Sequence, residues 1–249
     1  MDISVLIILM VVVAFATYFQ TVTGYGLAII VLGVTSNLDL MPLGQAASII
    51  GLVSIVSCAL ALPPKNWSKV NWSIVKMVSF SAVPASVLGV VLLAYLSNQA
   101  TNTLQLILGI SIILAAAQSV FRPSPFSQIS SPMSFLAYGS VAGLGGGLFG
   151  MAGPPIIFLM YRQPLEIVSI RLILLAIFLF ISLFRELYLV FAQGFVAENY
   201  LSALMALPVI FLMTWAGQKY PPKLSPIAIR RLTFMVLMVL GTLLVIASV

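Results

Sequence analysis

The chain has 249 residues, of which 62% are hydrophobic and only 6% are charged, whereas about a quarter of the residues in an ordinary soluble domain are charged. Eleven Lys and Arg outnumber five Asp and Glu and give a net charge of +6. So few charges cannot cover a folded domain in water, which excludes a soluble protein, nucleic-acid-binding domains included, and indicates an all-α polytopic membrane protein.

Eight apolar regions follow one another along the chain, and about 20 apolar residues make one helix that spans the hydrocarbon core. The first region, 3–34, is too long for one upright helix. The next three have the length of single spans, at residues 43–62, 73–96 and 103–120. The fifth region, 133–161, is again too long. Three more single spans follow it, at residues 165–192, 200–217 and 227–249.

Glycine interrupts both long regions near their middle. The interruptions are Thr23-Gly24-Tyr25-Gly26 in the first region and Gly143-Leu144-Gly145-Gly146-Gly147 in the second. A helix is broken at membrane depth only where protein or a water-lined cavity satisfies the freed amides. We therefore expect each region to be a re-entrant hairpin beside a cavity. Two short crossings, or glycines that only allow helices to pack closely, would fit the same pattern.

Both breaks are expected to present the positive end of a half-helix to this cavity. Thr23 can cap a half-helix that runs from about Gly26 to Val34. Pro154-Pro155 follow Gly153 and suit the first turn of another half-helix. A helix N-terminus carries about half a positive charge, so the cavity is a candidate anion site.

The basic residues indicate how often the second long region crosses, because short cytoplasmic loops collect Lys and Arg. If this region enters and returns on one side, the cytoplasmic side holds Lys65, Lys69, Lys76, Arg122, Arg162, Lys219, Lys223, Arg230 and Arg231. Asp39 and Glu198 then lie outside. A single crossing would place Lys65 and Lys69 opposite the later basic residues, so we expect the hairpin.

An internal repeat supports this topology, because three features recur 122 to 124 residues later. They are Pro42-Leu43 with Pro164-Leu165, the break at Gly24 with that near Gly146, and Pro84 with Pro208. We therefore divide the chain into a first repeat, 1–121, a Ser/Pro-rich cytoplasmic linker, 122–132, and a second repeat, 133–249. Each repeat has a broken hairpin and three spans, an odd number of crossings, so the two repeats are expected to be inverted.

Three charged residues lie well inside the span 165–192, beyond its first turn. Arg171 lies about 9 Å along the helix from Leu165, and it is either a countercharge for the anion or a side chain that snorkels to the interface. Arg185 is a candidate for the anion pathway, or else an interfacial anchor or an interhelical ion pair. Glu186 is the best candidate for proton coupling. Because sequence neighbours point about 100° apart on a helix, it need not pair with Arg185.

Uncharged polar side chains are further candidates for hydrogen bonds to an oxyanion: Gln20, Thr21, Thr23, Ser48 and Ser169. Most Ser and Thr residues in membrane helices instead bond the backbone of their own helix.

The residue inventory argues against metal sites and catalysis. Histidine is absent and Cys58 is the only cysteine, which excludes Cys/His zinc sites, iron–sulfur clusters and His-dependent triads. Only Glu186 among the carboxylates lies clearly inside a span, so neither a calcium or magnesium site nor paired-acid hydrolysis is expected. No phosphate-loop lysine follows the glycines, so ATP is not implied. We expect no enzyme, no metal and no cofactor.

The two interruptions and their surroundings resemble the TauE/SafE sulfite exporter family, also called TSUP, of bacterial inner-membrane proteins. The residues that carry the resemblance are Thr23-Gly24-Tyr25-Gly26-Leu27-Ala28, the stretch from Gly145 to Pro155, Tyr161 and Arg171. The resemblance covers essentially the whole chain. Family members often have Ile-Gly in place of Met151-Ala152, and Ala-Thr in place of Leu172-Ile173. The resemblance implies transport, usually outward, of sulfite, sulfoacetate or similar sulfur oxyanions and organic acids.

Together the residues and the resemblance predict a multi-pass secondary transporter that exports a small anion across the bacterial inner membrane. The expected substrate-binding residues are Thr23, Gly24, Tyr25, Gly26, Gly145, Gly146, Gly147, Gly153 and Arg171, and those of the pathway or coupling are Gln20, Ser48, Arg185 and Glu186. A passive anion channel and an organic-carboxylate transporter are the alternatives. The expected partners are the small anion, the lipid bilayer and a coupling proton or ion, with no nucleic acid; the oligomeric state is not indicated.

Overall fold

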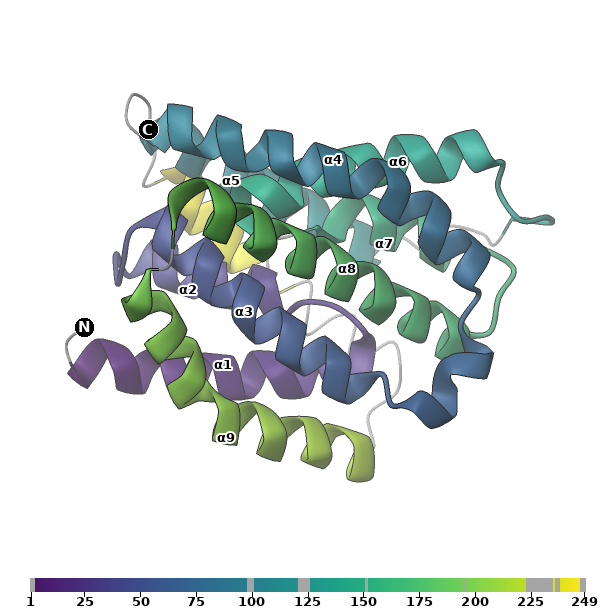
Figure 1. Ribbon diagram of the computed structural model, residues 1–249, viewed down its shortest axis with the longest axis horizontal. Coiled ribbons are helices and arrows are strands. Elements are labelled where there is room, and N and C mark those ends of the chain that lie inside the picture. The colour runs from purple at the N-terminus through teal and green to yellow at the C-terminus, as the bar shows by residue number, and fades with distance from the viewer. Residues whose placement is uncertain are drawn as a thin grey trace.

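The computed structural model describes residues 3–97, 101–120, 126–150, 152–194, 196–222, 235 and 238–246, and the regular secondary structure of this part of the chain is helical. In chain order its elements are α1 (Ile3–Thr23), α2 (Leu27–Asn37), α3 (Leu43–Ala61), the 3-10 helix η1 (Pro64–Lys69), α4 (Trp72–Ser97), α5 (Thr101–Val120), α6 (Pro132–Phe149), α7 (Gly153–Tyr161), α8 (Ile167–Gln193) and α9 (Ala197–Lys219). Figure 1 shows the axes of α1, α3, α4, α8 and α9 roughly aligned with one another. Much of the expected linker and of the expected last span lies outside the described residues.

Five of the described helices are long and apolar enough to cross a membrane: α1, α3, α4, α8 and α9. Large apolar side chains on their outer faces are exposed, such as Phe80, Phe191 and Leu204. Such faces would be costly to expose to water, whereas lipid covers them without cost. The protein is therefore an all-α, multi-pass membrane protein, as predicted.

The first long region is one full-length helix and a short returning one, rather than a hairpin of two short arms. α1 has 21 residues, about 31 Å at 1.5 Å per residue, which is enough to span the hydrocarbon core. The chain reverses after it because Gly24 and Gly26 adopt left-handed φ angles of 87° and 105°, which glycine adopts without steric cost. α2, which has only 11 residues, then packs against α1.

The prediction that Thr23 caps α2 is wrong. The N-cap of α2 is Gly26, which makes no side-chain hydrogen bond. Thr23 is instead the last residue of α1, and its hydroxyl oxygen lies 2.8 Å from the carbonyl oxygens of Phe19 and Tyr25. Two left-handed glycines separate it from the first turn of α2, so its side chain braces the break.

The second long region breaks later than its glycine run predicts. The run lies within α6, which ends at Phe149. Gly150 closes this helix with a φ of 65° and donates its N–H to the carbonyl groups of Gly145 and Gly146. α7 starts at Gly153 with two prolines in its first turn, as predicted. The break therefore falls between the end of α6 at Phe149 and the start of α7 at Gly153.

The glycine run stays helical because α4 packs closely against it. Three glycines spaced four residues apart face α4: Gly139, Gly143 and Gly147. A Cβ atom on Gly143 would overlap the backbone of Ala82, and one on Gly147 would overlap that of Ser86. Small residues let membrane helices approach to this distance. The close-packing interpretation of the glycines is therefore correct at these positions.

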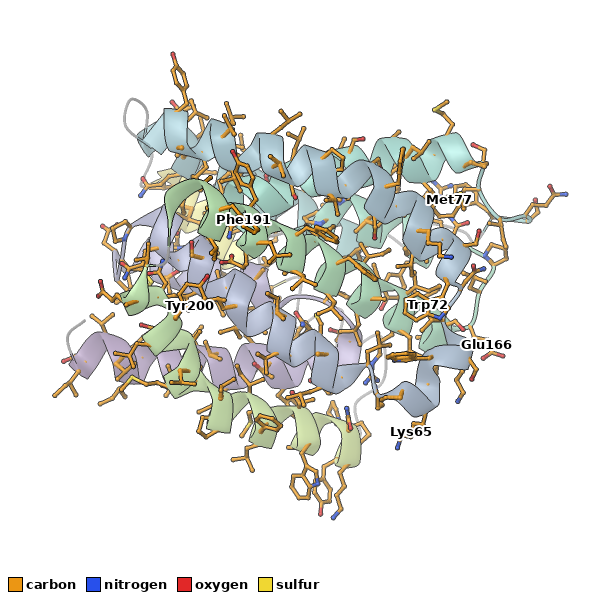
Figure 2. All side chains as sticks on the ribbon, viewed as in Figure 1. Lys65, Trp72, Met77, Glu166, Phe191 and Tyr200 are labelled. Carbon is orange, nitrogen blue, oxygen red and sulfur yellow. The ribbon has the colours of Figure 1, made fainter. Side chains whose placement is uncertain are left out.

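The two ends of the second long region lie together. The N–H of Phe126 donates to the carbonyl oxygen of Arg162 at 2.7 Å. The Gln163 side chain accepts from the N–H of Ser130 and donates to its hydroxyl, both at 2.9 Å. The chain thus enters and returns at one end of the bundle. Lys65 lies toward this side in Figure 2, and Tyr200 lies toward the opposite side.

The topology can be tested by labelling, because Ser127 is exposed beside these hydrogen bonds. If this end faces the cytoplasm, as the basic residues predict, Ser127→Cys in a Cys58→Ser background should not react with an impermeant thiol reagent added outside intact cells. Val196→Cys, at the exposed start of α9, should react in the same background. Labelling of Ser127→Cys but not of Val196→Cys would mean that the topology is reversed.

The packing of α4 on α6 can be tested with alanine. We expect Gly143→Ala to lower the free energy of unfolding by about 1–3 kcal/mol, because the added methyl group has no space beside Ala82. Gly44→Ala in α3 is the control, since a Cβ atom there meets nothing within 4 Å, and it should be neutral or slightly stabilising. Denaturant titration in detergent measures both, and equal stability of the two variants would contradict the close contact.

Candidate functional site

A small cavity, called the central cavity below, lies where the two breaks meet. It is lined by Gln20, Gly26, Ala28, Ile29, Ser54, Gly146, Gly150, Ala152, Gly153, Phe178, Ile181, Ser182 and Arg185. Its volume is about 30 Å³, which is room for about two water molecules. The chain therefore brings residues of both long regions to one small cavity, with α3 and α8 completing its walls.

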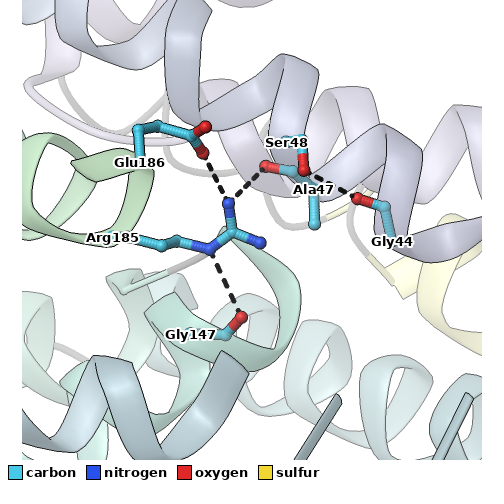
Figure 3. Close-up of polar contacts among 6 residues, drawn as sticks. All are labelled: Gly44, Ala47, Ser48, Gly147, Arg185 and Glu186. Carbon is cyan, nitrogen blue, oxygen red and sulfur yellow. Dashed lines mark hydrogen bonds and ion pairs between the residues drawn. The ribbon is translucent and has the colours of Figure 1, made fainter. Parts of the chain in front are cut away.

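Arg185 is the charged residue that lines this cavity, and its side chain is only 1% exposed. Figure 3 shows its guanidinium between three helices. Nη1 donates to Glu186 Oε1 at 2.6 Å and to the carbonyl oxygen of Ala47 in α3 at 3.3 Å. Nε donates to the carbonyl oxygen of Gly147 in α6 at 3.3 Å. Arg185 thus ties α8 to both neighbouring helices.

Arg185 also lines a second cavity, called the outer cavity below. It has a volume of about 320 Å³ and is lined by Gly44, Gln45, Ser48, Val90, Leu93, Ala94, Arg185, Leu189, Val196, Glu198 and Asn199. Arg185 is the residue that the two cavities share. It therefore belongs to the walls of both the central cavity and the outer one.

Glu186 pairs with Arg185, contrary to the expectation that sequence neighbours diverge. Their backbone directions do diverge, but the long arginine side chain allows its Nη1 to lie 2.6 Å from the Glu186 carboxylate. The carboxylate occupies space that a side chain at position 51 would fill, because a Cβ atom on Gly51 would overlap Oε1. A buried ion pair of this kind replaces the water that each charge loses.

Arg171 does not line the central cavity. It lies in the first turns of α8 against the first break, where a Cβ atom on Gly24 would be 2.8 Å from its Cγ and 3.1 Å from its Cα. Its Nε is buried and has no hydrogen-bond partner among the described residues. Arg171 and Arg185 lie about 21 Å apart along α8 and on nearly the same face of it. One guanidinium therefore lies at the first break, and the other lines the cavity.

The remaining predicted residues divide into those that line the central cavity and those that support it. Gly26, Gly146, Gly153 and Gln20 line it. Gly24, Thr23 and Tyr25 form the first break, and Gly145 and Gly147 belong to α6.

Aromatic and polar contacts hold the first break in place. The ring of Tyr25 makes edge contacts with Phe19 and Tyr161, with centroids 6.2 and 6.0 Å apart. The Tyr161 hydroxyl donates to the carbonyl oxygen of Thr23 at 3.1 Å. Thr23 and Tyr25 therefore position the break rather than face the cavity.

Most of the hydroxyl groups singled out in the sequence bond backbone carbonyl groups. Thr21 donates to Thr17 and Ser48 donates to Gly44, each within its own helix. Ser169 donates to the carbonyl oxygen of Lys69. The Gln20 amide instead donates to Ser57 Oγ and Cys58 Sγ in α3, both at 3.2 Å.

The two helix ends at the central cavity differ in their free N–H groups. The first turn of α2 keeps the amides of Leu27, Ala28 and Ile29. The first turn of α7 has prolines directly after Gly153, and proline has no N–H. The prolines therefore remove two N–H donors from the first turn of α7, and α2 is the stronger donor end.

Several lining residues were not predicted from the sequence, among them Ser54, Gly150 and Ser182. A signal for Ser182 exists, because it lies three residues before Arg185 and therefore on the same face of α8. Gly150 follows a glycine run that gave no reason to place the break after it. Ser54 had no distinguishing signal.

Comparison with known proteins gives one family match and one close relative. Residues 9–244 match the family model described as Sulfite exporter TauE/SafE. The chain is 39% identical over 233 residues to a protein of Cupriavidus necator named "Probable sulfite/organosulfonate exporter TauE", covering 94% of this chain and 91% of that relative. No solved structure matches the chain significantly.

The buried ion pair gives a stability prediction. We expect Arg185→Met to lower the free energy of unfolding by about 3–5 kcal/mol, because it leaves the Glu186 carboxylate buried without its partner. Adding Glu186→Gln should restore most of this loss, since the unpaired charge is then gone. Denaturant titration in detergent measures the three variants. Losses that simply add in the double variant would contradict the pairing.

Proposed function

The chain belongs to the TauE/SafE sulfite exporter family, and from this premise we propose that it is a secondary transporter that exports small sulfur oxyanions or organosulfonates across the bacterial inner membrane. The observation that carries the proposal is the buried guanidinium of Arg185 at the cavity where both breaks meet. Burying a cation at that depth costs free energy, and a role in binding the anion would explain why the protein keeps it there.

The chemistry of the central cavity suits an oxyanion. A guanidinium presents five N–H donors in a planar fork that matches the oxygens of a sulfite or sulfonate group better than a point charge does. The hydroxyl groups of Ser54 and Ser182 and the N-terminus of α2 lie at the same cavity, and the α2 end adds a partial positive charge. Together these groups would replace the hydration that the anion loses on entry.

The size of the cavity favours a small anion in the conformation described. The cavity has space for about two water molecules, which is comparable with the volume of a sulfite ion or of the head group of a sulfonate. A longer organosulfonate requires the cavity to widen, and the outer cavity beyond Arg185 offers the larger space.

Alternating access in this proposal comes from movement of two inverted repeats against each other. The recurrence of the breaks supports the inverted arrangement, and residues of both repeats line the central cavity. Pro84 and Pro208 lie inside α4 and α9, where a missing hydrogen bond makes each helix easier to bend. Arg171 would hold the anion at the first break as it approaches from the cytoplasm.

Counterflow in proteoliposomes tests the function. Vesicles loaded with unlabelled sulfoacetate or sulfite should take up the labelled anion with saturable kinetics, because an alternating-access carrier exchanges substrate. Arg171→Ala should reduce this uptake at least tenfold and Arg171→Lys less, since lysine keeps the charge and loses the fork. Gly146→Leu should block uptake by filling the central cavity. Lys65→Ala, which removes an exposed cation from η1, should transport like the wild type.

Other outcomes identify the alternatives. Flux that rises linearly with anion concentration and shows no counterflow would indicate a passive channel. Cation flux without anion flux would contradict the proposed function. Full uptake by Arg171→Ala would remove Arg171 from the binding site and leave it as a residue that supports the first break.

A further inference from the structure

One guanidinium at the central cavity already has an anionic partner. The Glu186 carboxylate lies 2.6 Å from Arg185 Nη1, and both side chains are almost fully buried. A transported anion that binds Arg185 must therefore share the guanidinium with Glu186 or replace it.

Sharing is electrostatically unfavourable at this depth. Two unit charges 4 Å apart interact by about 4 kcal/mol even at an effective dielectric constant of 20. Two negative charges on one guanidinium would leave the site with a net negative charge, and no other cation among the described residues lines either cavity. A proton on Glu186 removes this excess charge.

We propose that Glu186 is the proton-binding residue of the transporter: an anion that binds Arg185 displaces the Glu186 carboxylate, which takes up one proton, so that anion and proton cross together. The inference rests on the proposed anion site at Arg185. The proton comes from water on the side where the anion enters and returns to water where the anion leaves. The site is then neutral when empty, as an ion pair, and neutral when loaded with a monoanion.

The helices around Glu186 offer few competing ionisable groups. α3 presents Ala47 and Gly51 to the ion pair, and α6 presents Gly147. On α9, Tyr200 lies within electrostatic reach of Glu186, but a phenol ordinarily ionises near pH 10 and stays neutral in the physiological range.

Two other ionisable groups lie on the outer cavity and on α8. Glu198 of α9 lines the outer cavity and is itself exposed. Arg171 lies about 21 Å away along α8. Glu186 is therefore the buried carboxylate in contact with the binding arginine.

The space around Glu186 fits a carboxyl group that changes partners. Gly51 leaves room beside Oε1 that any other residue would fill. The Arg185 guanidinium, which Glu186 contacts, also lines the outer cavity of about 320 Å³. Water in that cavity would reach the ion pair and carry the proton to and from it.

A pH gradient across proteoliposomes tests the coupling. Methanesulfonate is a suitable probe because it is a monoanion whose sulfonate stays ionised near pH 7, so a proton that accompanies it is carried by the protein. With the membrane potential clamped at zero, a gradient of one pH unit should drive about tenfold accumulation of methanesulfonate in the wild type, on the side with the higher pH. A pH-sensitive dye inside the vesicles should report proton entry with the anion.

Glu186→Gln separates coupling from transport. Glutamine keeps the shape and an oxygen that accepts from Arg185, but it cannot exchange a proton. We expect counterflow of methanesulfonate to persist in this variant, while accumulation falls from about tenfold to about onefold and the dye signal disappears. Glu166→Gln, the same change at the exposed start of α8, should behave like the wild type.

Each outcome decides the inference. Wild-type counterflow without any response to the pH gradient, or tenfold accumulation by Glu186→Gln, would overturn the proton role and leave the anion transporter intact. Absence of methanesulfonate flux in the wild type would instead overturn the proposed transport of small sulfonates on which the inference rests. Loss of counterflow in a folded Glu186→Gln variant would show that the carboxylate is required for transport itself, which also overturns the proposal.

Discussion

A charge inside a membrane needs partners from the protein itself, because hydrocarbon supplies none. The bonds of Arg185 to Glu186, Ala47 and Gly147 satisfy this constraint with groups from three helices. The geometry of these hydrogen bonds limits which side chains fit around Arg185. Position 51 has no room for a side chain beside the carboxylate, and position 147 must let α4 approach while its carbonyl oxygen accepts from the guanidinium. The close packing of α4 on α6 and the ion pair in α8 therefore depend on each other.

The two breaks solve the second problem of a helical membrane protein, which is how to expose backbone without leaving it unpaired. Each does so in its own way. Left-handed glycines reverse the chain at the first break, and Thr23 and Tyr161 bond its carbonyl groups. At the second break Gly150 turns back onto the end of α6. The exposed backbone is consequently limited to a few amides at the central cavity.

The sequence was sufficient for the fold class, most helix positions and the meeting of two glycine breaks. It was insufficient where tertiary packing decides. Glycines in α6 look alike in the sequence, yet Gly147 packs on α4 while Gly146 lines the cavity. The depth of Arg171 in its helix made it the stronger candidate, but α3 and α6 surround Arg185 instead. Neither distinction can be made without knowing which helix lies opposite.

The prolines at the start of α7 have a consequence for how a substrate would be oriented. They remove hydrogen-bond donors from one wall of the central cavity, and Ala152 and Phe178 make the nearby lining apolar. The α2 end and Arg185 remain as the polar wall. An organosulfonate is itself two-faced, with a charged head and a carbon tail. Such a molecule would enter this cavity in one orientation, and an inorganic oxyanion, polar on every side, would leave one wall of the cavity unmatched.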